Sequence, residues 1–297
     1  MSASDFGYLR VARWFNERGW NTVFPHLPFH YSRTPRGCFN GELAITANMI
    51  HNGETLRQGV VELRQLMAML REEGCTEFGV LGTSFGGWNG ALLSFLETDF
   101  RFIALIQPIV NIEHAIWQNP GSVLMRRLLR SRGILPGESE RHAHLSSPLH
   151  GIPLCGGDRV VITAGVYDRL SPASDLLNLK RRWSGARLLE VRQGHFGYRA
   201  LRETLKEIEK ISVASRGNPV DGCKRKIPRN LSFRACPLAQ NPLICLSFKN
   251  GHRRNKGIKR HAGEPGSNRK ERENGISKQR PRNELLRHDY YRRGSRR

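Results

Sequence analysis

The first 213 residues alternate between strand-like and helix-period segments, and this alternation constrains the fold more than any other feature of the chain. Short apolar runs, typical of buried strands, are followed by longer segments whose apolar residues recur at helical spacing. Such an alternation is typical of an α/β fold, in which helices cover both faces of a mainly parallel sheet. The apolar fraction of 38% is high enough for the chain to bury a core.

The expected elements are placed by residue range. Strands are expected at 20–27, 78–82, 102–106, 159–164 and 187–191, and helices from residue 4 or 5 to Gly19 and at about 54–73, 85–97, 174–183 and 198–211. Residues 110–150 interrupt the alternation with short helix-like stretches and a polar loop, which indicates a small helical cap. We therefore expect one α/β domain over residues 1–213, with a cap at about 110–150.

Residues 214–297 differ from the rest of the chain in their charge. They hold 23 of the 48 Lys and Arg residues and 6 of the 26 Asp and Glu residues, a net charge of +17 that leaves +5 for residues 1–213. Apart from a small apolar island at 241–248 (NPLICLSF), they carry few apolar side chains whose burial offsets the entropy cost of ordering. We expect a basic, disordered tail that attracts polyanions nonspecifically.

A glycine-rich turn lies between an expected strand and an expected helix. Residues 82–86 read Gly-Thr-Ser-Phe-Gly, the pattern G-x-S-x-G in the strand-to-helix context that a nucleophile elbow requires. Glycines flank the serine in such an elbow because the strained turn leaves no room for a Cβ atom, and the strain exposes the hydroxyl above the sheet. Ser84 is therefore the candidate nucleophile, and an ordinary tight turn is the alternative.

A serine hydroxyl is a poor nucleophile until a base takes its proton, so a histidine and a carboxylate are expected later in the chain. Asp168 comes just after the strand at 159–164, and His195 comes just after the strand at 187–191. The carboxyl ends of parallel strands share one edge of a sheet, so the loops that hold Ser84, Asp168 and His195 are expected to converge. The alternatives are a turn or helix-capping carboxylate for Asp168 and a surface loop histidine for His195.

Three stretches together resemble a known family. They are GTSFGG at 82–87, GVYDRLSP at 165–172 and QGHFGY at 193–198, and their order of serine, acid and histidine is similar to that of α/β-hydrolases of the serine-esterase type. Residues 1 to about 213 resemble, more narrowly, bacterial abhydrolase-domain proteins. The resemblance implies hydrolysis of an ester, thioester or amide of a small-molecule acyl substrate, without a metal or an organic cofactor.

The resemblance also implies a role for each matching residue. Ser84 attacks the acyl carbonyl, His195 acts first as general base and then as general acid, and Asp168 orients the imidazole. The backbone N–H of Phe85 donates one hydrogen bond to the oxyanion.

The chain departs from the family before its first helix. The second oxyanion donor normally comes from a loop between a central strand and that helix, and too few residues precede the helix here to form the strand. The resemblance places the missing strand between those at 20–27 and 78–82. We therefore expect an N-terminally truncated hydrolase with a gap inside its sheet, and a mis-assigned gene boundary or reading frame is a hypothesis for both ends.

Aromatic and basic residues near the expected site have weaker assignments. Trp88 and Trp117 are candidates for lining an acyl pocket, although core packing is the commoner role of tryptophan. Four residues after the first strand fit either contact with an anionic substrate or a solvated polar loop: His26, His30, Arg33 and Arg36.

Several classes of protein are excluded or disfavoured. No stretch of about 18 apolar residues predicts a membrane span, and no basic start followed by an apolar run predicts a secretory signal. We expect a cytoplasmic location and reduced thiols at Cys38, Cys75, Cys155, Cys223, Cys236 and Cys245. Neither the cysteine spacing nor the histidines at 142, 144 and 150 predict a metal site.

Two alternatives to an active hydrolase stay open. One is a catalytically impaired, truncated hydrolase-like protein, which the missing oxyanion loop favours. The other is a basic nucleic-acid-binding protein that acts through its tail, although no recognised nucleic-acid-binding module is present.

Overall fold

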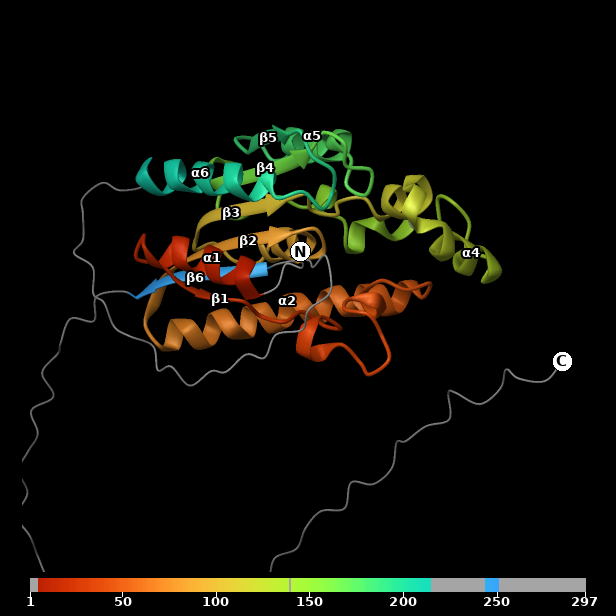
Figure 1. Ribbon diagram of the computed structural model, residues 1–297, viewed down its shortest axis with the longest axis horizontal. Helices are drawn as coiled ribbons and strands as arrows, with labels where there is room; N and C mark the ends of the chain where they lie inside the picture. The colour runs from red at the N-terminus through yellow and green to blue at the C-terminus, as the bar shows by residue number, and fades with distance from the viewer. Residues whose placement is uncertain (1–4, 139, 215–243, 251–297) are drawn as a thin grey trace, which may run out of the picture. The chain divides into compact units, whose positions relative to one another are not determined.

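The computed structural model describes residues 5–138, 140–214 and 244–250 (Figure 1). Its helices are α1 (Asp5–Asn16), α2 (Met49–Glu72), α3 (Phe85–Leu93), α4 (Val123–Ser131), α5 (Ala173–Arg182) and α6 (Arg199–Ala214). Its strands are β1 (Asn21–Val23), β2 (Cys75–Thr83), β3 (Phe100–Ile106), β4 (Val160–Gly165), β5 (Arg187–Val191) and β6 (Ile244–Asn250).

The strands form one mixed sheet in the order β1-β6-β2-β3-β4-β5. β2, β3, β4 and β5 pair in parallel, whereas β6 pairs antiparallel with β1 on one side and with β2 on the other. Parallel neighbours need crossover connections, which α3 and α5 supply after β2 and β4. The predicted α/β architecture, a mainly parallel sheet with helices on both faces, is confirmed.

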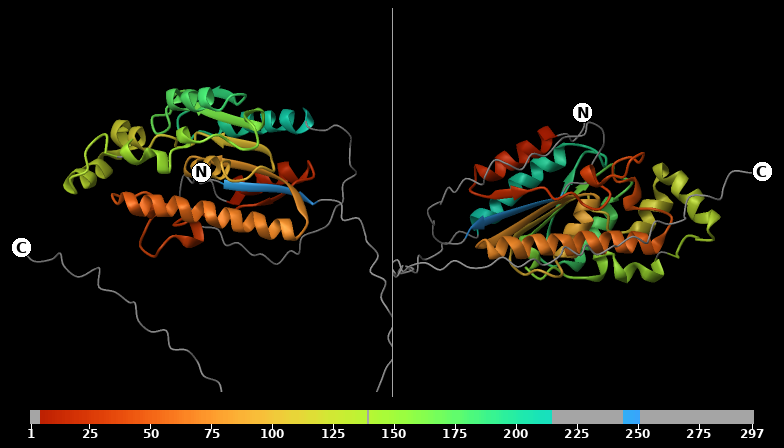
Figure 2. Two further views of the ribbon diagram at one scale, coloured as in Figure 1. Left: turned by 180° about the vertical axis from the view of Figure 1, so that it is seen from behind. Right: turned by 90° about the horizontal axis from the view of Figure 1, so that it is seen from below.

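Two apolar cores lie on opposite faces of the sheet, and Figure 2 shows helices on both of these faces. On one face, α2, α3 and α5 pack against the strands, and Leu63 and Met67 of α2 are almost wholly buried there. On the other face lie α1 and α6, where the rings of Phe15 and Phe102 stack with centroids 5.6 Å apart. Both faces of the sheet are covered, so its strands are apolar on both sides.

Element boundaries differ from the predicted ones where side chains or proline decide them. α2 begins at Met49 instead of about residue 54, because the Asn48 side chain caps it by accepting from the His51 N–H at 3.1 Å. β1 spans three residues instead of the eight predicted at 20–27, and the proline at 25 lacks the N–H that a longer ladder needs.

β6 occupies the position between β1 and β2 at which the sequence predicted a gap. Leu246 pairs with Val23 of β1 and with Val80 of β2, so the ladder is continuous on both sides. Side chains of β6 alternate between the two cores, since Leu246 and Phe248 face the α2 side and Cys245 faces the α1 side. The interior of the sheet is therefore filled.

This strand corrects the expectation that all of residues 214–297 form a tail. Ile244–Asn250 overlaps the apolar island that the sequence contains, and burying it pairs backbone groups of β1 and β2 that would otherwise lack partners. Residues 215–243 and 251–297, which carry most of the predicted basic tail, lie outside the described residues. Residues 1–4, which precede the first helix, also lie outside them.

Residues 110–150 form the short helical segments expected of them. A π-helical turn at His114–Gln118 is followed by α4 and by 3-10 turns at Glu140–Leu145 and Pro148–His150. In Figure 1 this part of the chain lies beyond the carboxyl ends of β2, β3 and β4. It therefore lies at the edge of the sheet where the predicted site residues follow their strands.

Candidate active site

Ser84 lies at a strained turn between β2 and α3. Its φ of 54° and ψ of −118° are unusual for a residue with a side chain, and its N–H is held by the Ile106 carbonyl at 2.9 Å. A Cβ atom at Gly82 would lie 2.5 Å from the Gly86 carbonyl oxygen, so the turn closes only because residue 82 is glycine. This is the backbone geometry that a nucleophile elbow requires.

The structure brings Ser84, His195 and Asp168 together from three loops. His195 Nε2 lies 2.8 Å from Ser84 Oγ, and His195 Nδ1 lies 2.7 Å from Asp168 Oδ2. The side chains of His195 and Asp168 are 6% and 0% exposed, so this hydrogen-bonded chain is largely shielded from water. The three side chains form an unbroken hydroxyl–imidazole–carboxylate series.

The Asp168 carboxylate is held by four hydrogen bonds. Its Oδ1 accepts from the backbone N–H groups of Leu170 and Ser171 at 2.8 and 3.0 Å, within the loop that follows β4. Its Oδ2 accepts from His195 and from the side-chain amide of Gln107, the latter at 2.6 Å. Every donor is in place to fix the carboxylate plane, and hence the orientation of the imidazole.

The sequence analysis missed Gln107. It follows β3, has a left-handed φ of 46°, and is 1% exposed. A signal was available, because Gln107 is a polar residue directly after a buried strand, as Asp168 and His195 are.

Phe85 is the first residue of α3, directly after Ser84. The N–H groups of a helix's first turn have no acceptor within the helix, so the Phe85 N–H has the character needed to bind an anion beside the serine. The Phe85 ring stacks on His30 with centroids 5.2 Å apart, which ties the loop after β1 to the elbow.

Three of the four residues suggested for an anionic substrate, His26, His30 and Arg33, have partners within the protein. Arg33 forms a bidentate ion pair with Glu62 of α2, in which Nη2 and Oε1 are 3.0 Å apart. His30 is buried against Phe85 and bonds the Pro28 carbonyl at 2.8 Å, and burial lowers its pKa below 6.5. Burial, aided by the Arg33 charge, also lowers the pKa of His26. These three residues are therefore two imidazoles that are neutral at pH 7 and a neutralised arginine, whereas Arg36 of the same loop is exposed.

The two tryptophans that the sequence singled out have different surroundings. Trp88 lies one helical turn after Ser84, is 3% exposed, and donates its indole N–H to the Ser146 carbonyl at 2.6 Å. Trp117 lies in the 110–150 segment, where the Arg130 guanidinium covers its ring at 5.4 Å. Trp88 lines a cavity next to the elbow helix, whereas Trp117 is not among the residues that line it.

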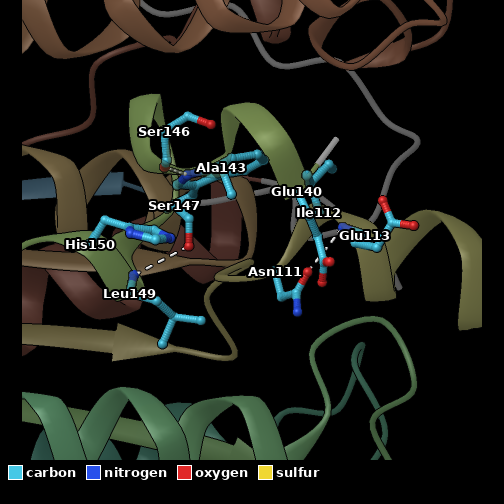
Figure 3. Close-up of a pocket in the computed structure, with 10 residues that line it drawn as sticks. Asn111, Ile112, Glu113, Glu140, Ala143, Ser146, Ser147, Leu149 and His150 are labelled. Carbon is cyan, nitrogen blue, oxygen red and sulfur yellow. Dashed lines mark hydrogen bonds between the residues drawn. The ribbon is translucent and has the colours of Figure 1, made fainter. Parts of the chain in front are cut away.

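That cavity has a volume of about 220 Å³, and apart from Trp88 of α3 its lining residues belong to the 110–150 segment (Figure 3). Its walls are both polar and apolar and come from Trp88, Asn111, Ile112, Glu113, Glu140, Ala143, Ser146, Ser147, Leu149 and His150. Figure 3 shows the Asn111 side chain bonded to the Glu113 backbone and Ser147 bonded to Leu149, so parts of this wall are internally braced.

A second histidine–carboxylate pair joins the 110–150 segment to α5. His114 Nδ1 lies 2.8 Å from Asp175 Oδ2, and burial raises the pKa of the Asp175 carboxyl. This pair was not predicted from the sequence, because its members are 61 residues apart and follow no motif.

Metal sites, cysteines and membrane-spanning helices can be assessed in the described part of the chain. Within residues 5–138, 140–214 and 244–250, no group of three or more His, Cys, Asp or Glu residues is placed to hold a metal ion. Cys38, Cys75, Cys155 and Cys245 form no disulfide within the described residues, and Cys223 and Cys236 lie outside them. Of the helices that are described, none has both the length and the apolar character that crossing a membrane requires.

A mainly parallel sheet, a strained serine elbow after β2, and an acid and a histidine after later strands make this an α/β-hydrolase-like fold. No protein-family model and no curated protein matches the chain.

Several solved structures are similar to it at low identity. A putative hydrolase from Agrobacterium vitis S4 is 14% identical, with 52% of this chain and 68% of that one covered and a TM-score of 0.40. Acetyl xylan esterase 1 from Thermoanaerobacterium sp. JW/SL YS485 is 15% identical, with 59% and 60% covered and a TM-score of 0.40. A puromycin-hydrolyzing peptidase of Mycobacterium tuberculosis is 19% identical, with 45% and 21% covered and a TM-score of 0.34. The chain thus spans only about a fifth of that peptidase's length.

Proposed function

We propose that this protein is a serine hydrolase that cleaves an ester, thioester or amide of a small-molecule substrate through an acyl-enzyme on Ser84. The observation that carries the proposal is the continuous series of hydrogen bonds from Ser84 Oγ through His195 to Asp168. Neither the similar structures nor the sequence motif alone carries it.

The hydrogen bonds define the state of the imidazole from which the reaction starts. The Asp168 carboxylate only accepts, so the proton of a neutral His195 lies on Nδ1 and the lone pair of Nε2 faces the serine hydroxyl. His195 is thereby ready to accept the Ser84 proton while Oγ attacks the acyl carbonyl carbon.

In each later step His195 passes the proton that it holds to the group that departs. The tetrahedral intermediate collapses as protonated His195 gives its Nε2 proton to the leaving alcohol, thiol or amine, and the acyl group stays on Ser84. Water then attacks the acyl carbon and loses a proton to His195. His195 gives that proton to Ser84 Oγ as the bond between Oγ and the acyl carbon breaks, which releases the carboxylic acid and restores the serine hydroxyl. The Phe85 N–H, at the start of α3, stabilises the oxyanion of the tetrahedral intermediate in both acylation and deacylation.

We assign Trp88 and the cavity beside α3 to the acyl or leaving group of a small substrate. The lining of this cavity includes Trp88, one helical turn after Ser84, and none of the three triad residues. In this proposal Trp117 contributes to the 110–150 segment rather than to the cavity wall.

Labelling with a fluorophosphonate probe tests the proposal most directly. The full-length protein should form an adduct on Ser84 and hydrolyse p-nitrophenyl esters, and Ser84→Ala should abolish the adduct and lower kcat/KM by about 10³-fold or more. Ser131→Ala, at an exposed serine on α4, is the matched control and should leave both unchanged.

A folded wild-type protein that neither labels at Ser84 nor hydrolyses any ester of the series would overturn the proposal. That result would favour the catalytically impaired alternative. Binding of nucleic acid by the basic residues of 214–297 stays a prediction, because most of these residues lie outside the described part of the chain.

A further inference from the structure

Residues 106–108 connect the three loops that meet at the candidate active site. The Ile106 carbonyl accepts from the Ser84 N–H, the Gln107 side chain donates to Asp168, and the Pro108 carbonyl accepts from the Ser171 hydroxyl in the acid loop. Among them, only Gln107 reaches the triad through its side chain.

The Gln107 amide is held in one orientation by its neighbours. Its nitrogen donates to Asp168 Oδ2 at 2.6 Å and to the Gly194 carbonyl at 3.1 Å, and its oxygen accepts from the Gln193 amide at 2.8 Å. A carboxylate and a carbonyl are both acceptors, so the nitrogen of Gln107 has to face them. The amide thus joins the acid to the residue that precedes His195.

Gln193 extends this connection through the histidine loop. Its amide nitrogen also donates to the Gly197 carbonyl at 3.2 Å, and its oxygen accepts from the Ala200 N–H at 2.8 Å at the start of α6. The His195 loop is therefore bound to the acid by two glutamine amides in series, independently of the His195–Asp168 hydrogen bond.

The Gln107 amide is packed tightly against the backbone of β4. A Cβ atom at Gly165 would lie 2.5 Å from Gln107 Nε2, so the amide packs directly against the β4 backbone. The left-handed φ of 46° at Gln107, which costs free energy for a residue with a side chain, is maintained by the hydrogen bond from its N–H to the Thr163 carbonyl at 2.8 Å.

We propose that Gln107 is a positioning residue of the hydrolase: its neutral N–H donor fixes the Asp168 oxygen that orients His195, and its amide ties the acid loop to the histidine loop. This inference rests on the proposed function. Gln107 does not touch substrate in this scheme, so its loss lowers kcat while KM stays unchanged.

The charge of the side chain at 107 provides a second signature. A glutamate there would add a carboxylate next to Asp168, and the added negative charge would favour protonated His195. The acid limb of the pH profile would therefore move to higher pH in Gln107→Glu. This shift reports that the side chain at 107 lies beside the acid and the histidine, whereas a loss of kcat at constant KM on removal of the donor reports positioning.

The test uses the full-length wild type and three variants at residue 107, assayed with p-nitrophenyl esters over a range of pH. Gln107→Met, which keeps the length of the side chain but removes both donors, should lower kcat by about 10- to 100-fold with KM unchanged. Gln107→Glu should lower kcat and move the acid limb upward by about one pH unit. Gln107→Asn, which keeps an amide one methylene shorter, should retain more activity than Gln107→Met.

Matched controls and thermal unfolding separate positioning from folding. Gln58→Met and Gln58→Glu, at an exposed glutamine of α2, should change neither kcat nor the pH profile. If Gln107→Met unfolds at the assay temperature, Gln107→Asn and Gln107→Glu carry the test, because both keep a polar group at the site.

The outcomes for the two proposals are distinguishable. An inactive wild type that does not label at Ser84 refutes the proposed function itself. An active wild type whose folded Gln107 variants keep wild-type kcat and an unshifted pH profile refutes the role of Gln107 alone, and the assignment of Ser84 stands.

Discussion

The two sides of the sheet reach the same packing by different routes. From β2 to β5 the strands are parallel, follow the order of the chain, and end in the loops that carry Ser84, Gln107, Asp168 and His195. From β1 to β2 the sheet is completed by β6, an antiparallel strand from much later in the chain. The comparison teaches that an interior position of a parallel sheet accepts a strand of either direction, provided both faces of that strand are apolar.

The site depends on both sides of the sheet. β6 pairs with Gly82 and Leu81 of β2, immediately before the elbow, while β3 pairs with β2 on its other edge. β2 is therefore held by a ladder on each edge where it leads into Ser84. Three predictions test whether β6, the strand inserted between β1 and β2, is as firmly held as the parallel strands, and a fourth concerns the edge of the parallel side.

The largest expected effect is the protection of buried thiols on the two sides of the sheet. Burial raises the pKa of Cys245 in β6 to about 12 and that of Cys155, just before β4, to about 11. At pH 8 both should react with iodoacetamide at least about 10²-fold more slowly than the half-buried Cys38. Peptide mass mapping after timed alkylation measures the rates, and rapid labelling of Cys245 alone would show that β6 opens.

The next largest effect is expected for a charge placed inside the inserted strand. Leu246 is 0% exposed, so Leu246→Asp should lower the free energy of unfolding by about 4 kcal/mol or more, since an unpaired carboxylate is buried. Leu124→Asp, at a leucine of α4 that is 69% exposed, is the control and should change stability by less than about 0.5 kcal/mol. Equal, small effects in urea unfolding would contradict the pairing of β6.

A gentler substitution compares the two sides of the sheet directly. Leu105 of β3 and Leu246 of β6 are both 0% exposed, so Leu105→Ala and Leu246→Ala should each cost about 2 to 5 kcal/mol. Urea denaturation of both variants gives the values. If the cost at Leu246 is under about 0.5 kcal/mol while that at Leu105 stays high, the inserted strand contributes little to stability.

The smallest effect is expected at an ion pair that fastens α6 to the edge of the parallel side. Glu207 accepts from Lys210 at 2.8 Å and from Arg187 of β5 at 2.7 Å, and these hydrogen bonds, that of Lys210 foremost, lower its pKa below 4.5. A lowered carboxyl pKa adds stability above pH 4.5 that is lost as the pH falls through the folded-state pKa.

Glu207→Gln should therefore destabilise the protein at pH 7 by less than about 1 kcal/mol, because solvent screens the pair. The difference from wild type should vanish at low pH. Glu203→Gln, which removes only an exposed contact with Lys206, is the control. A difference that persists unchanged at low pH would mean that the charge of Glu207 contributes no stability.

Much of the fold could be read from local patterns. Apolar periodicity predicted the order of strands and helices from β2 to α6, and the strand–glycine–serine–helix sequence predicted the elbow. Asp168 and His195 were found because each follows a strand, and the structure brings both within hydrogen-bonding distance of their expected neighbours. Each of these patterns spans only a few consecutive residues, so it can be recognised without knowing which distant residues the segment contacts.

Two features have local sequence signals whose meaning depends on partners distant in the chain. The island at 241–248 is apolar, but its pairing depends on β1 and β2, which lie more than 150 residues earlier in the chain. Gln107 likewise looks like any polar residue after a strand, and its role follows from the orientation of its amide between two distant loops.

The amino-acid sequence by itself determined which segments are strands or helices and which residue types stand at the ends of the strands, because periodicity and turn chemistry are local. Only the tertiary structure decided which strand fills the position beside β2 and which neutral donor supports Asp168. Both choices are made by backbone and side-chain groups that need hydrogen-bond partners once they are buried, and those partners come from distant parts of the chain.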